Sequence, residues 1–151
     1  MPAVLRIDSW DFPLFLHVLG ATLLFGGMLT TTALALVGRS SQHAALLARY
    51  AFRTLLFVVV PSWVLTRIAA EWILSREKEL IPGLDDKGWV GTGFIVTDAG
   101  AVLIIVLGVL AFLSVRKGGT GRLGTFVAAL SVIYVIALGV AWFAMSAKPG
   151  A

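Results

Sequence analysis

The chain has 151 residues, of which 59% are hydrophobic, and it carries a formal net charge of +4. Its mean hydropathy of +0.96 excludes an ordinary water-soluble globule. The chain has no cysteine, which excludes disulfides, iron–sulfur clusters and thiol catalysis. Its basic residues fall between apolar runs, so we attribute the positive charge to loops at the membrane surface and expect no nucleic-acid partner.

Four apolar runs follow one another and predict an all-α, up-down bundle of four membrane-spanning helices. We expect these helices at residues 12–37, 54–74, 90–115 and 123–146, within a single transmembrane domain that covers residues 1–151. Each run matches the roughly 20 residues that cross the hydrocarbon core of a bilayer. Residues 41–53 mix apolar side chains with two arginines, which favours a short helix lying at the membrane surface.

The basic residues are concentrated in two of the loops and predict the orientation of the chain. The loops between helices one and two and between helices three and four hold six bases and no acid, whereas the opposite side holds five bases mixed with acids. Positively charged loops favour the cytoplasmic side. We therefore expect a multi-pass protein of the inner (plasma) membrane with both termini outside.

The first apolar run carries no formal charge from Phe12 to Gly38, and its one ionisable group is His17. An ionisable residue inside a membrane span is a candidate functional group. His17 either forms a hydrogen bond to another helix, binds a metal or haem, or relays protons. Met145, near the end of the fourth run, is expected at a similar depth. A His/Met pair suits haem b or a soft copper site, so either is a candidate cofactor.

Three charged residues are expected at comparable depth in the second and third helices. Arg67 and Glu71 are four residues apart and share a helix face. A charge in hydrocarbon is costly, so each should point inward and find a partner, and Asp98 is the expected cross-helix partner of Arg67. The three residues form either a structural ion pair or the lining of a polar cavity that opens outward. In the second case Arg67 would balance the propionate charge of a bound haem.

The segment Leu16-His17-Val18-Leu19-Gly20-Ala21, followed by Phe25-Gly26-Gly27, resembles the first helix of small bacterial membrane proteins. These include uncharacterised four-helix families of the actinobacterial type and, more distantly, copper-resistance D-like proteins and HemJ-type protoporphyrinogen oxidases. The ending Ala141-Trp142-Phe143-Ala144-Met145-Ser146 is similar to the tail of actinobacterial members. The resemblance implies a four-helix bundle in which His17 binds haem or copper.

Three functions remain open at this point. The first is a haem- or metal-associated redox protein with His17 as a ligand. The second is a small carrier or proton-coupled module in which Glu71 and Asp98 titrate. The third is a structural or accessory subunit, in a homo-oligomer or a larger membrane complex. No Walker loop, nucleophile elbow or dinucleotide fingerprint indicates an enzyme class.

Overall fold

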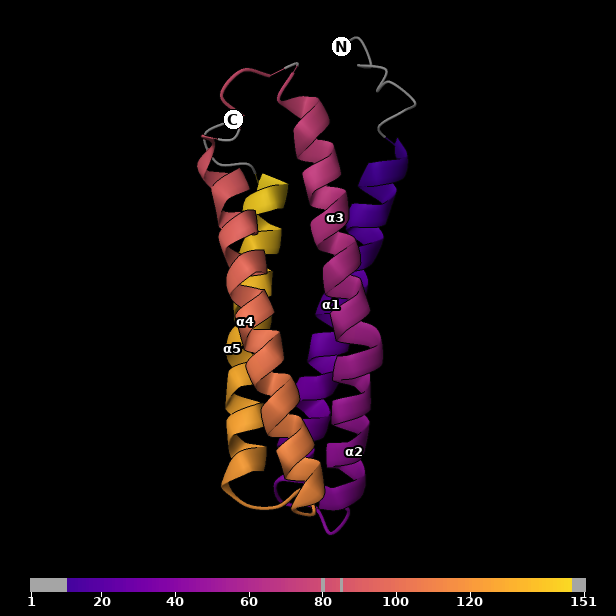
Figure 1. The fold of residues 1–151 in the computed structure, drawn as a ribbon. Coiled ribbons are helices and arrows are strands. Elements are labelled where there is room, and N and C mark those ends of the chain that lie inside the picture. The colour runs from indigo at the N-terminus through magenta and orange to yellow at the C-terminus, as the bar shows by residue number, and fades with distance from the viewer. Residues whose placement is uncertain (1–10, 80, 85, 148–151) are drawn as a thin grey trace.

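The computed structural model describes residues 11–79, 81–84 and 86–147, apart from the side chain of Asp11. The described residues form helices α1 (Asp11–Gly38), α2 (Ala44–Thr54), η2 (Leu55–Val59), α3 (Val60–Glu77), α4 (Gly88–Arg116) and α5 (Arg122–Ala147). They run up and down in an antiparallel bundle (Figure 1). Counting α2, η2 and α3 as one continuous rod, four helices are long and apolar enough to cross a membrane. The predicted all-α four-helix bundle is therefore confirmed, and the chain is a small multi-pass membrane protein.

The second membrane helix begins at Ala44 instead of near residue 54. Residues 41–53 were expected to form a separate helix on the membrane surface. Most of them instead form α2, the first part of the continuous α2–η2–α3 helix. Its small side chains Ala44 and Ala51 are buried, so it packs along α1 and α4, while Arg49 and Arg53 point outward. Alanine, leucine and arginine are strong helix formers, and the helix therefore continues through a stretch that hydropathy alone separates from the span.

A π-helical turn, η2, joins α2 to α3 immediately before Pro61. Proline has no backbone N–H to donate to the preceding turn, and a wider turn accommodates this loss without ending the helix. The turn packs against Gly27 of α1, where an added Cβ would lie 3.0 Å from both Val58 and Val59. The close approach of α1 at this level thus depends on glycine.

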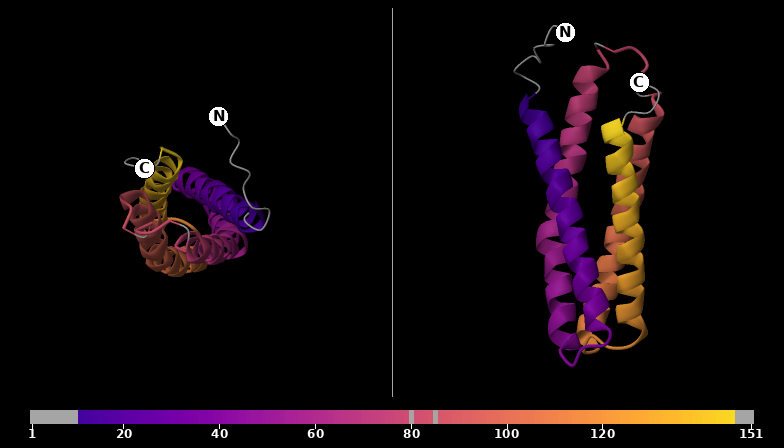
Figure 2. Two further views of the ribbon diagram at one scale, coloured as in Figure 1. Left: turned by 90° about the horizontal axis from the view of Figure 1, so that it is seen from above. Right: turned by 180° about the vertical axis from the view of Figure 1, so that it is seen from behind.

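The bundle consists of two helix pairs arranged as a V. α1 lies along the α2–α3 rod, and α4 lies along α5. The pairs meet at the end that holds residues 38–44 and 116–122, which we call the narrow end, and diverge toward the end where α1 begins and α5 finishes, which we call the wide end (Figures 1 and 2). α1 also packs against α5, whereas α3 and α4 contact each other much less. The bundle is consequently most open between α3 and α4 near the wide end.

Apolar side chains fill the space between the two pairs toward the narrow end. Met28, Val59, Leu107 and Tyr134 each have a relative exposure of 0%. Tyr134 lies against Gly100, where a Cβ would collide with the phenol ring and its oxygen. This tightly packed region ends below the open half of the bundle and forms the floor of the site.

Candidate functional site

A cavity of about 610 Å³ occupies the V near the wide end. This volume lies within the range of roughly 300–1,000 Å³ that is usual for ligand and cofactor sites. Its walls are mainly apolar and aromatic and come from α1 and α3 on one side and from α4 and α5 on the other. Leu84, from the segment between α3 and α4, is 4% exposed and lines the same cavity.

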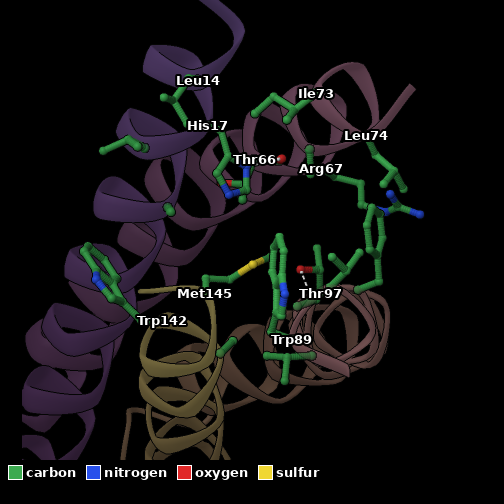
Figure 3. A pocket seen from close by; sticks show the side chains of 18 of the residues that line it. Leu14, His17, Thr66, Arg67, Ile73, Leu74, Trp89, Thr97, Trp142 and Met145 are labelled. Carbon is green, nitrogen blue, oxygen red and sulfur yellow. Dashed lines mark hydrogen bonds between the residues drawn. The ribbon is translucent and has the colours of Figure 1, made fainter. Parts of the chain in front are cut away.

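His17 lies on the wall formed by α1 and α3, and its ring is fixed by a hydrogen bond (Figure 3). Its Nδ1 is 3.3 Å from the backbone oxygen of Thr66. A carbonyl oxygen only accepts, so this bond requires the proton on Nδ1 and leaves the lone pair of Nε2 free in the neutral ring. Gly20 brings the two backbones close enough, because an added Cβ there would lie 2.9 Å from the Thr66 nitrogen.

Met145 projects into the cavity from α5, on the opposite wall (Figure 3). Its terminal methyl group packs so closely against Gly93 of α4 that any Cβ at that position would collide with it. Trp89, one helical turn before Gly93, lines the cavity beside the methionine. His17 and Met145 therefore line the same cavity.

Arg67 lines the cavity through part of its side chain, which runs from α3 away from His17 (Figure 3). Its Nε donates to Oδ1 of Asp98 over 3.0 Å, and its Nη1 donates to Oε1 of Glu71. The guanidinium also lies over the ring of Phe94, 4.7 Å from the ring centroid. The predicted pairing of Arg67 with Asp98 across the two helices is confirmed.

The two carboxylates do not point inward as expected. The side chains of Glu71 and Asp98 are 55% and 58% exposed, against 25% for Arg67, and neither carboxylate lines the cavity. Arg67 reaches out from the cavity edge to meet them on the outer surface of the bundle. Since α3 and α4 diverge, each carboxylate lies on the outer flank of its helix, and a long arginine side chain spans the gap.

A second link between α3 and α4 joins a residue one turn before Arg67 on α3 to the residue next to Asp98 on α4. The indole Nε1 of Trp63 donates to the backbone oxygen of Thr97 over 2.9 Å. Together with the Arg67–Asp98 pair, this bond holds the two helices together at the level where they begin to diverge.

Several wall residues were not identified from the sequence. Trp89, Trp142 and Arg76 of α3 all line the cavity. The sequence contains no signal for these roles, because they depend on the angle between the helix pairs. Among the described residues, no group of three or more His, Asp or Glu side chains is arranged to hold a metal ion.

The chain was compared with protein-family models, curated protein sequences and solved structures. None of the three comparisons finds a match.

Proposed function

We propose that this membrane protein binds haem b in the cavity and that His17 would hold its iron. The observation that supports this most directly is the bond from His17 Nδ1 to the Thr66 carbonyl, on the wall of a largely apolar cavity of about 610 Å³. Histidines that bind metals typically donate their other ring N–H to a carbonyl or carboxylate, which fixes the tautomer and the ring orientation.

The available ligands suit haem better than a copper ion. His17 and Met145 provide two donors, and the described residues contain no larger ligand cluster. A porphyrin supplies four nitrogen ligands of its own, so one or two protein ligands are sufficient, and His or His/Met sets are common. Bound haem would supply one-electron redox chemistry, while the chain supplies the apolar walls and the fixed imidazole.

The propionate groups of haem are assigned to the wide end of the cavity. Arg67, expected to balance their charge, already donates to two carboxylates. Arg76 lies closer to the wide end, lines the same cavity and stacks over Trp72, with its Cζ 5.7 Å from the ring centroid. We therefore assign the propionate contact first to Arg76 and second to Arg67.

Visible absorption spectra of purified protein test the proposal. Wild type, expressed with haem supplementation, should show a Soret band and sharpened bands on dithionite reduction, and His17→Ala should lose them. His43→Ala is the matched control, because His43 is the only other histidine and lies exposed at the narrow end. A colourless wild type, or a spectrum unchanged in His17→Ala at equal yield, would refute haem binding at this residue.

A second candidate is a small carrier for a membrane-soluble molecule, with Glu71 and Asp98 as titrating groups. It is favoured by the largely apolar walls of the cavity and by α3 and α4, which both line it and contact each other little. A colourless wild type that binds a hydrophobic fluorophore, and an Asp98→Asn variant that assembles normally but loses transport, would support this candidate.

We infer that the narrow end faces the cytoplasm of a bacterial cell and that the wide end faces outward across the inner membrane. The six bases expected on the cytoplasmic side all belong to segments at the narrow end. This orientation agrees with the positive-inside rule. The short first-helix resemblance to copper-resistance D-like and HemJ-type proteins supports haem or copper at His17 and nothing further.

A further inference from the structure

Glu71 and Asp98 expose their carboxylates on the outer surface of the bundle. Asp98 lies ten residues from the start of α4, which corresponds to a depth of about 15 Å along a helix of about 43 Å. The hydrocarbon core is about 30 Å thick, so a helix of this length extends only about 6–7 Å beyond it on each side. With α4 centred on the core, Asp98 lies within the hydrocarbon, and its side chain is 58% exposed.

The cluster of Glu71, Arg67 and Asp98 is not neutral. Two carboxylates share one guanidinium, which leaves a net charge of −1. The only described side chain that donates to either carboxylate is Arg67. Hydrocarbon cannot supply the missing charge or hydrogen bonds, and an uncompensated charge inside a membrane is unfavourable.

The surface around the cluster is apolar and belongs to the same helix faces. On α4, Ile95 and Val102 lie three and four residues from Asp98 and are 69% and 63% exposed. On α3, Ile68 lies three residues from Glu71 and is 60% exposed. Residues at these spacings are neighbours on one face of a helix. The cluster is therefore a charged spot within an otherwise apolar surface of two membrane helices.

Charge distinguishes between the possible occupants of this surface. A second copy of the chain would bring the same cluster, so two faces in contact would carry −2. Arg67 is the only base that the described part of the chain places at this depth. A helix that carries one lysine or arginine would bring the total charge to zero and would supply the missing donors.

We propose that the α3–α4 face around Glu71, Arg67 and Asp98 is a docking surface for a membrane-spanning helix of another protein, which carries one lysine or arginine at matching depth. The apolar neighbours pack against this helix, and its cation is shared by Glu71 and Asp98. Neither carboxylate lines the cavity, and Arg67, which donates to both, is the one member of the cluster that does.

Association with a designed peptide tests the proposal. The probe is a fluorescently labelled, leucine-rich membrane-spanning peptide with one lysine, placed one helical turn from its centre, and its partner is an identical peptide with leucine at that position. Energy transfer to labelled full-length protein in phosphatidylcholine vesicles reports association. We expect the lysine peptide to associate at least tenfold more tightly than the leucine peptide.

Variants of the carboxylates then test whether Glu71 and Asp98 cause the preference for the lysine peptide. Asp98→Asn, Glu71→Gln and the double variant should lose the preference for lysine, whereas Glu79→Gln, which removes an exposed carboxylate beyond the end of α3, should keep it. Asn and Gln preserve the side-chain shapes, and helical circular dichroism verifies folding. Equal association of the two peptides, or a preference retained in the double variant, would overturn the proposal. A wild-type homodimer that the double variant loses would also overturn it, because the face would then serve a second copy.

Discussion

A methyl group added at Gly20 should disturb the site without entering the cavity. The Cβ of Gly20→Ala would lie 2.9 Å from the backbone nitrogen of Thr66 and 2.7 Å from its Oγ1. Ordinary contact begins at 3.4 Å. Because backbone atoms cannot rotate away, α1 and α3 must separate by about 0.5 Å, which is the difference between 3.4 and 2.9 Å.

This separation acts directly on His17, one turn before Gly20. Its Nδ1 is 3.3 Å from the Thr66 oxygen, and a further 0.5 Å gives about 3.8 Å, which is too long for a hydrogen bond. We expect Gly20→Ala to lower the free energy of unfolding by about 1–3 kcal/mol, as is usual for overpacking. The freed imidazole should also bind its ligand more weakly.

Two measurements on detergent-purified protein check this prediction. Unfolding in SDS gives the stability, and a ¹⁵N spectrum of histidine-labelled protein, which contains only two histidines, reports the state of Nδ1. Gly26→Ala is the control, because nothing lies within 4 Å of a Cβ at that position. If Gly20→Ala unfolds like the control and the His17 resonance is unchanged, the proposed contact between α1 and α3 does not hold.

Three further outcomes follow from the structure. Tyr134→Phe should raise the free energy of unfolding in SDS by about 1 kcal/mol, because the buried Tyr134 hydroxyl has no hydrogen-bond partner among the described residues. A loss of stability would show that this hydroxyl is hydrogen-bonded. Trp63→Phe should lower the free energy of unfolding by about 1 kcal/mol, because it removes the hydrogen bond to Thr97. Spin labels on α3 and α4 should then report a wider separation of the two helices. Unchanged distances would mean that this bond does not hold the helices together. In cells, Ser40→Cys should resist an impermeant maleimide and Ile81→Cys should react, and the reverse pattern would invert the proposed orientation.

The sequence predicts the four membrane helices because uninterrupted apolar stretches of this length have few other uses. It misplaces the start of the second helix, since Arg49 and Arg53 lower the hydropathy of a segment that is nevertheless helical. Hydropathy reports solvent preference, whereas helix formation depends on backbone propensity and packing. Hydropathy and helix formation therefore give different boundaries at a helix end that carries basic residues.

Depth along a helix can be estimated from the sequence, which predicts similar depths for His17, Arg67 and Met145; all three line the same cavity. Direction around the helix axis cannot be read in the same way, because the membrane helices are apolar on nearly every face. Glu71 and Asp98 were therefore expected inside the bundle, although the angle between the helix pairs places them on its outer surface. The cavity also results from the angle between the helix pairs, which the amino-acid composition does not determine.

The V shape gives the protein a different cross-section in the two leaflets. At the wide end the helix pairs stand apart and occupy more membrane area than at the narrow end (Figure 2). A ligand that spreads or draws together the pairs changes that area in one leaflet only. By thermodynamic reciprocity, lateral pressure and curvature in that leaflet then alter ligand affinity. Binding of such a ligand would thereby be linked to the mechanical state of the surrounding bilayer.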